Sequence, residues 1–150
     1  MKTSQLLAKV QRKFKKQGIF LTEKRSRILE VLCRAEQSVS AYDIVGLYKE
    51  IFDESIPAMS VYRILDYLIE IRAVHKLESM NQFVLCEHAA CDHDHSKAQF
   101  LICDDCNAVE EIVLDQEIVS SLKNSLLKAK FALKSSQLEF HGVCANCATN

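Results

Sequence analysis

Two Cys-x-x-Cys pairs constrain this chain more than any other feature of its sequence. Cys103 and Cys106 lie in LICDDCNAVEE, and Cys144 and Cys147 repeat the spacing in HGVCANCATN. One pair alone could be a redox dithiol or half of a disulfide framework, but four thiolates at tetrahedral corners are what a structural zinc ion prefers. Because 37 residues separate Cys106 from Cys144, we expect the ion to clamp together the ends of a substantial looped-out subdomain.

The composition favours metal binding over disulfides. Seven cysteines, an odd number, fit a closed disulfide framework poorly. The first residues, MKTSQLLAKVQRKF, include no continuous apolar segment, so we expect neither a signal peptide nor a membrane span, and a cytoplasmic location. In that reducing compartment disulfides are rare. At 150 residues the chain could form one ordinary domain or two small ones, whose thin cores would benefit from a metal or a partner subunit.

The net charge of -1 hides two halves of opposite sign. Residues 1–80 carry 14 Lys and Arg against 10 Asp and Glu, whereas residues 81–150 carry 5 against 10. Lys15 and Lys16 belong to a steeply basic stretch that is opposed only by Glu23 within the first 27 residues. This stretch could bind phosphates, although on charge alone a solvated helix face is the more ordinary explanation. The asymmetry indicates that the two halves have different roles.

The basic half contains three segments with apolar residues at helical spacing. Thr22 can cap the first, which extends to about residue 35, and Ser40 with Asp43 resembles a capping box at the start of the second. Pro57 marks the start of the third, in SIPAMSVYRILDYLIEIRA. The apolar residues expected to face inward are Ile28, Leu29, Val31 and Leu32 in the first segment, and Val61, Leu65, Leu68 and Ile69 in the third.

The third helix has the features of a DNA recognition helix. Ser60, Tyr62 and Arg63 lie at its start, opposite the apolar stripe. A helix in the major groove reads bases with its N-terminal residues, and an arginine can make two hydrogen bonds to guanine. The next two β-prone runs, AVHKLE and QFVLCE, predict a hairpin. Three helices and a hairpin predict a winged helix-turn-helix.

The acidic half predicts a second domain of α/β type. AQFLIC and AVEEIVL are strand candidates, residues 115–130 fit a helix, and LKSSQLEFHG is a further strand candidate. We expect a winged-helix domain over residues 1–84, a hinge over 85–92, and a dimerisation and metal-binding domain over 93–150. The segment CEHAACDHDHS, around this hinge, contains two Cys, three His and two Asp. So many potential ligands are unexpected in an inert loop.

These motifs together resemble the ferric uptake regulator (Fur) family, most closely its zinc uptake regulator (Zur) branch. The resemblance runs from about residue 21 to residue 147, through LTEKRSRILEVL, SAYDI, SVYRILDYL, AVHKLES, VLCEH, LICDDC and FHGVCANC. SVYR and the paired Cys-x-x-Cys motifs are specific to the family. The resemblance implies an α+β fold, with an N-terminal winged helix-turn-helix followed by a small α/β dimerisation domain that holds a four-cysteine zinc site. It also implies a homodimeric, metal-responsive repressor that binds double-stranded operator DNA, and it adds Tyr42 to the DNA-binding candidates.

The same resemblance implies a second, regulatory zinc ion. His75, Cys86, His95 and Glu111 occur in the combination that points to the zinc branch, and together they form a neutral four-coordinate shell. We therefore expect two zinc ions per chain, one structural and one regulatory, in a repressor that controls zinc uptake genes.

Each regulatory ligand has an ordinary alternative. A lone histidine on a wing strand is more often a surface residue, a single cysteine is more often a small buried hydrophobe, and a lone glutamate on a strand is usually solvated. His93 is the strongest rival for His95 because the two lie two residues apart. His88 and Cys91 are weaker rivals.

Three further residues need separate interpretation. Asn107 stands where the family usually has glycine, and asparagine can adopt the same left-handed turn conformation. Cys33 lies on the apolar face of the helix predicted after Thr22, so we expect it in the core. His141 precedes the second Cys-x-x-Cys pair and could orient that strand end or act beside the ligands, without binding metal itself.

Other functions remain as alternatives. Zinc with histidine, cysteine and glutamate also occurs in hydrolases and deaminases, where one coordination position stays open for water. The deaminase signature, His-x-Glu followed by Pro-Cys-x-x-Cys, is absent from the sequence, and only three glycines and one proline are available to shape a substrate pocket. We expect no enzyme and no small-molecule substrate. A zinc-ribbon adaptor is a further alternative, and an iron or peroxide sensor is the alternative within the family.

Overall fold

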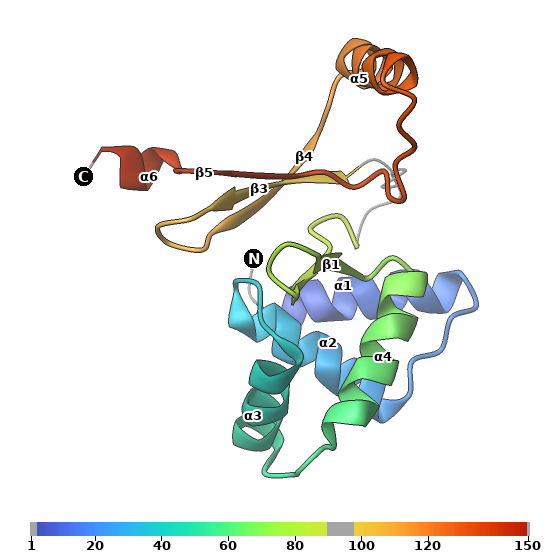
Figure 1. Cartoon of the computed structure of the whole chain (residues 1–150). Coiled ribbons are helices and arrows are strands. Elements are labelled where there is room, and N and C mark those ends of the chain that lie inside the picture. Colours follow the sequence, from blue (N-terminus) through green and yellow to red (C-terminus); the bar gives the residue numbers. More distant parts are fainter. Residues whose placement is uncertain (1–2, 90–97, 150) are drawn as a thin grey trace. The chain divides into compact units, whose positions relative to one another are not determined.

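The computed structural model describes residues 3–89 and 98–149. The chain divides into two compact units, Met1–His93 and Asp94–Asn150, and each has its own sheet (Figure 1). The predicted domain boundaries, including a hinge whose last residues lie outside the described ranges, stay a prediction. Among the described helices, none combines the length and the apolar character that crossing a membrane requires.

The first unit contains one more helix than the three expected from the sequence. Residues that we interpreted only as a basic stretch form the first helix, and its apolar side buries Val10 and Phe14. The charges therefore lie on the outer face of an amphipathic helix, which is compatible both with a solvated face and with phosphate binding. The elements are α1 (Thr3–Lys16), α2 (Glu23–Ala35), α3 (Ala41–Phe52), α4 (Ala58–Glu70), β1 (Val74–Leu77) and β2 (Gln82–Leu85).

Both predicted N-terminal caps are confirmed. The Thr22 hydroxyl accepts a hydrogen bond from the backbone N–H of Arg25 at 3.4 Å. Ser40 and Asp43 form a full capping box, in which each side chain accepts a backbone hydrogen bond from the other residue, at 3.1 and 2.9 Å. Hydrogen bonds from the Ser40 hydroxyl and then from its backbone N–H lower the pKa of Asp43, because they favour the carboxylate.

The core of the first unit includes the apolar residues that the helical periodicity selected in α2 and α4. The residues that α2 contributes are Ile28, Leu29, Val31 and Leu32, and those from α4 are Val61, Leu65 and Leu68, while Ile69 is half-buried. Cys33 is also buried, as predicted, and desolvation raises its pKa to about 11. It therefore stays a neutral thiol.

The wing is a β-hairpin that is hydrogen-bonded to the segment connecting α2 and α3. β1 and β2 are antiparallel, with His75 opposite Val84. Val39 forms an isolated bridge to Phe83 through two backbone hydrogen bonds of 3.0 and 2.7 Å. The buried Ser38 hydroxyl donates to the Gln82 side-chain oxygen at 2.6 Å. These contacts complete the winged helix-turn-helix that the sequence predicted.

The described residues of the second unit, 98–149, form a three-stranded sheet and two helices. The sheet order is β4-β3-β5, so β3 is central, antiparallel to β4 and parallel to β5. The predicted strand LKSSQLEFHG is too long, because its first part is held by the side chain of Gln99, which donates to Ser136 O at 3.0 Å and accepts from the Leu138 N–H. The elements are β3 (Ala98–Cys103), β4 (Val109–Val113), α5 (Gln116–Lys128), β5 (Glu139–Gly142) and α6 (Ala145–Ala148), of which α6 was not predicted.

Candidate metal centres and nucleic-acid interface

Parallel pairing of β3 with β5 brings the two Cys-x-x-Cys pairs to one end of the sheet. Cys103, the last residue of β3, is opposite Gly142, the last residue of β5, and the N–H of Asp104 donates to Gly142 O at 2.9 Å. Cys144 follows two residues later and donates its backbone N–H to the Cys103 sulfur at 3.3 Å. The sheet register thus places the pairs together.

Each pair is held in a tight turn. After β3, the N–H of Asn107 donates to Cys103 O at 2.9 Å, and the N–H of Cys103 donates to Ala108 O at 2.9 Å. Asn107 has a φ of 59°, which confirms the left-handed conformation expected of a residue that replaces glycine. In the second pair, the first turn of α6 brings Cys147 back toward Cys144, through an N–H to carbonyl bond of 3.1 Å.

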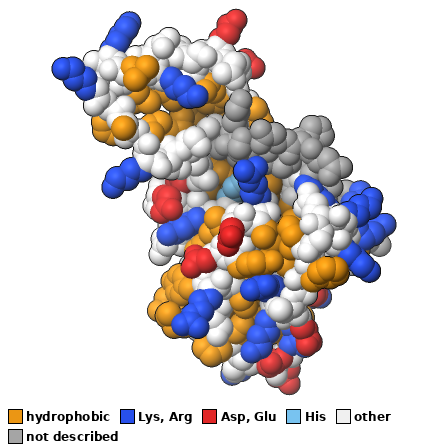
Figure 2. Space-filling view, turned by 90° about the vertical axis from the view of Figure 1, so that its right-hand side faces the viewer, with side chains coloured by type: hydrophobic (Ala, Val, Ile, Leu, Met, Phe, Trp, Pro, Cys, Tyr) orange, Lys and Arg blue, Asp and Glu red, His pale blue; other side chains and the backbone are white. Residues whose placement is uncertain are grey.

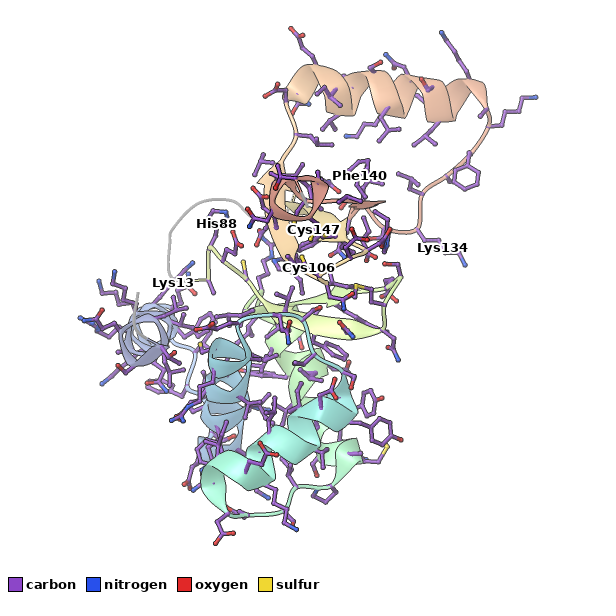
Figure 3. All side chains as sticks on the ribbon, turned by 90° about the vertical axis from the view of Figure 1, so that its left-hand side faces the viewer. Lys13, His88, Cys106, Lys134, Phe140 and Cys147 are labelled. Carbon is purple, nitrogen blue, oxygen red and sulfur yellow. The ribbon has the colours of Figure 1, made fainter. Side chains whose placement is uncertain are left out.

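The four sulfur atoms of Cys103, Cys106, Cys144 and Cys147 all lie within 4.8 Å of one another. Figure 3 labels Cys106 and Cys147, one from each pair, close to one another in this unit. The sulfurs of Cys106 and Cys144 are 3.8 Å apart, and the edge of a tetrahedron with zinc-sulfur bonds of about 2.3 Å is about 3.8 Å. The cluster therefore has the donors and the spacing to hold a tetrahedral metal ion.

The thiols differ in acidity because they share hydrogen bonds. The backbone N–H of Cys144, followed by that of Cys106, lowers the pKa of Cys103 to about 6. Hydrogen bonding with the thiols of Cys144 and Cys106 raises the pKa of Cys147 to about 12. Four close thiols cannot all ionise at neutral pH by themselves, and a divalent cation supplies the charge that would let them do so.

His141 lies beside this cluster on β5. Its Nδ1 donates to the Asp104 carboxylate at 2.7 Å, and Asp104 directly follows the ligand candidate Cys103. The contact connects the end of β5 to the turn after β3. This placement fits the orienting role expected for His141.

Two of the expected regulatory ligands come together in the first unit. His75 lies on β1, and Cys86 directly follows β2, where its N–H donates to Ala73 O at 2.9 Å. Their ligand atoms lie within 4.8 Å of each other. Cys86 is fully buried and His75 is half-buried. A thiol and an imidazole at this distance could bind one metal ion.

The remaining regulatory candidates come from other segments of the sequence. Glu111 is on β4 in the second unit, opposite Phe100 of β3. His88 is half-buried in the turn that follows Cys86, where Ala89 donates to Cys86 O at 3.0 Å. His95, His93 and Cys91 lie outside the described residues.

The DNA-binding candidates lie at helix ends in the first unit. Arg63 is exposed in the second turn of α4, while Ser60 and Tyr62 are half-buried. Tyr42, in the first turn of α3, is 73% exposed. Lys15 and Lys16 are exposed at the end of α1. Figure 2 shows one face of this unit, on which Lys and Arg side chains lie among hydrophobic and acidic ones.

Two arginines of the basic stretch have structural partners, some of them distant in the sequence. Arg27 is bonded to Glu23 at 2.5 Å and to Glu54. The guanidinium of Arg25 lies 3.6 Å from the centre of the Tyr67 ring, and so connects α2 to α4. The spacing between Arg27 and Glu23 predicts their i, i+4 pair, but sequence alone gives no signal for the other contacts.

A family model and individual named proteins that match this chain all represent uptake regulators. The model of the Ferric uptake regulator family matches residues 16–141. The zinc uptake regulation protein of Escherichia coli (strain K12) is 38% identical over 146 residues, 97% of this chain and 82% of that protein. The ferric uptake regulation protein of Bacillus subtilis (strain 168) is 31% identical over 132 residues, 85% of this chain and 84% of that protein.

A solved structure extends the similarity to three dimensions. The structure of a zinc uptake regulator complexed with zinc and DNA has a TM-score of 0.82 and 32% sequence identity, covering 99% of this chain and 97% of that one. These matches confirm the resemblance that the motifs predicted. The chain belongs to the ferric uptake regulator family.

Proposed function

We propose that this chain is a zinc-responsive transcriptional repressor, which binds operator DNA as a zinc-loaded homodimer in the cytoplasm and controls zinc uptake genes. The observation that carries the proposal is similarity over 99% of the chain to a zinc uptake regulator complexed with zinc and DNA. Family membership also weighs against the zinc hydrolase alternative, because the matching relatives are named as uptake regulation proteins.

Two observations favour zinc over iron or peroxide as the signal. Identity to the zinc uptake regulation protein is 38%, compared with 31% to the ferric one. The buried thiol of Cys86 lies close to His75, and a thiolate ligand favours zinc over the harder manganese and ferrous ions. An iron or peroxide sensor of the same family is the second candidate.

Each chain is proposed to hold two zinc ions. The first is structural, and its proposed ligands are Cys103, Cys106, Cys144 and Cys147, whose spacing suits a tetrahedral ion. The second is exchangeable, and its proposed ligands are His75, Cys86, His95 and Glu111. His93 and His88 are the alternative imidazoles.

The second ion is proposed to act by restricting the winged helices. Its ligands come from both sides of the predicted hinge, so metal binding limits how the two winged helices of a dimer can be spaced. Operator binding requires both recognition helices to meet major grooves about one helical turn apart. An ion that binds the competent arrangement more tightly shifts the population toward it.

Dimerisation is proposed to use the second unit. Every residue of α5, all within the described part of the chain, is exposed or half-buried, and β5 is an edge strand of its sheet. Figure 3 shows Phe140 on this unit. A second copy of the chain would cover such apolar side chains. The exposed ones are Leu101, Val113, Ile118, Leu127, Phe131, Leu133, Phe140 and Val143.

DNA contact is proposed to use the first unit. Arg63 reads a base from α4, and Ser60 and Tyr62 contribute from the same helix. Tyr42 approaches from the start of α3, whereas Lys15 and Lys16 contact phosphates. The exposed positions of Arg63, Tyr42 and the two lysines support these assignments.

The proposal is tested by gel-shift titration of genomic fragments with the full-length protein, in buffers that fix the free zinc concentration, with ferrous iron as comparison. A zinc-responsive repressor should shift a specific set of fragments, and the free zinc concentration needed for this should be lower than the free iron concentration. Binding that follows iron instead would favour the second candidate. Fragments bound equally with and without metal would contradict the proposal.

A further inference from the structure

The exposed side of α4 carries an apolar residue where a solvated helix would carry a polar one. Within this fully described helix, the exposed residues recur at i, i+4, i+7 and i+11, opposite the buried stripe. They are Met59, Arg63, Asp66 and Glu70. Met59 is 64% exposed and lies in the first helical turn. A single exposed hydrophobic residue is ordinary on a protein surface, so the position of Met59 on α4 is the informative feature.

The charges along this stripe determine which part of α4 can approach DNA. Asp66 and Glu70 would meet phosphate charge if the whole helix entered the groove, and that repulsion disfavours their approach. The positive charge of Arg63 is instead attracted to the phosphates. The helix therefore presents its N-terminal half, with Met59 and Arg63 foremost, and turns its acidic C-terminal half away.

The first turn of α4 fixes the position of the Met59 backbone. Pro57 is the N-cap, and its carbonyl accepts hydrogen bonds from Ser60 N at 3.0 Å and Val61 N at 3.2 Å. Val61 is fully buried, so the turn is anchored to the core. The thioether itself is flexible and polarisable, and it adapts to an irregular apolar surface.

The major groove offers one apolar group to such a side chain, the 5-methyl group of thymine. We propose that Met59 is a specificity-determining residue that packs on a thymine methyl in each operator half-site, an inference that rests on the proposed function as a DNA-binding repressor. Residues four apart on a helix are about 6 Å apart, and successive bases are spaced by about 3.4 Å. The thymine that Met59 reads is then within about two base steps of the base that Arg63 reads.

Replacement of thymine by uracil tests this directly, because uracil lacks only the methyl group. Each thymine of a zinc-dependent operator duplex is replaced in turn, symmetrically in both half-sites, and the dissociation constant of the full-length, zinc-loaded protein is measured. We expect a weakening of about three- to tenfold at one thymine, within about two steps of the position at which Arg63→Ala relaxes base preference. Because the site is exposed, Met59→Ala and Met59→Leu should both leave folding intact.

The variants assign the effect to the side chain. Met59→Ala should bind the thymine and uracil duplexes equally, whereas Met59→Leu, which keeps an apolar side chain of similar volume, should still discriminate. The proposal would be overturned if wild-type protein bound the thymine and uracil duplexes with equal affinity at every position near the base that Arg63 reads. It would also be overturned if Met59→Ala lost as much affinity as wild type on replacement of thymine by uracil. Absence of any zinc-dependent operator would instead remove the proposed function, so the two failures are distinguishable.

Discussion

Cys106 Sγ lies 3.8 Å from Cys144 Sγ, although 38 positions separate the two residues in the sequence. The register of β3 with β5 brings them together, because Cys103 is opposite Gly142. β5 has only four residues and one neighbouring strand. A metal ion bound by the four thiolates would therefore stabilise the attachment of this short strand, and metal binding and folding of the second unit should be linked.

Cys103→Ser should remove about one zinc ion per chain and severely destabilise the second unit, since an incomplete four-cysteine shell loses both a ligand and the clamp across β3 and β5. Zinc content by mass spectrometry and dimer content by sedimentation check this. Cys33→Ala is the matched control, because this buried thiol lies in the first unit and its loss should leave the zinc content unchanged. A Cys103→Ser protein that stays dimeric with full zinc content would refute the structural site.

Phe140→Lys should weaken the dimer. Phe140 is exposed on β5 and pairs in register with the exposed Leu101 on β3, and a charge on this face would have to be desolvated in an interface between two copies. Sedimentation equilibrium should show dissociation at a higher concentration than for wild type. Ser120→Lys, on the polar side of α5, is the control and should leave the dimer intact. Equal dimer stability of both variants would place the interface elsewhere.

The helices of the first unit could be predicted in detail because their signals are local. Thr22, Ser40 and Asp43 mark helix starts through contacts three residues away, and the apolar spacing selects the buried side. Helix α1 was not predicted, because this segment was interpreted only by its positive charge. The i, i+4 spacing of Val10 and Phe14 is nevertheless that of a buried helix face.

The second unit was harder to predict because its contacts are distant in sequence. The Gln99 side chain hydrogen-bonds to the backbone of Ser136 and Leu138, 37 and 39 positions away. These bonds hold the segment before β5, which the sequence predicted as strand. The parallel pairing of β3 and β5 is equally distant in sequence, and the repeated Cys-x-x-Cys motif predicted only that the two cysteine pairs meet, not that the strands pair. The contacts of Arg25 with Tyr67 and of Arg27 with Glu54 depend on how the helices pack, which periodicity does not determine.

Ser40→Ala should lower the free energy of unfolding by about 1 kcal/mol, because it removes one acceptor of the α3 capping box. Asp43 is ionised at neutral pH even at the ordinary aspartate pKa, and hydrogen bonds from Ser40 lower its pKa further. This contribution is therefore present above the ordinary aspartate pKa and is lost only as the pH falls through the lowered value. Denaturant unfolding of zinc-loaded protein between pH 6 and 8 should therefore show a constant difference from wild type. A difference that vanishes at pH 6 would contradict this assignment.

Arg63→Ala should cost about 1 to 3 kcal/mol of operator affinity and relax preference at one position of each half-site, because a base contact is lost. Lys15→Ala should weaken binding to all sequences alike and reduce the salt dependence, because a phosphate contact is lost. Fluorescence anisotropy on operator and random duplexes at several salt concentrations separates the two effects. Equal losses on both duplexes for Arg63→Ala would argue against direct readout.

We propose that an exchangeable zinc ion controls DNA binding through Cys86. The direct test is the operator affinity of wild type and Cys86→Ala, measured by fluorescence anisotropy across a series of buffered free zinc concentrations. Because a zinc-binding thiolate is removed while the four-cysteine cluster is untouched, the variant should stay dimeric, retain about one zinc per chain, and shift its zinc midpoint upward by about tenfold or more. An unchanged midpoint in Cys86→Ala would contradict the account.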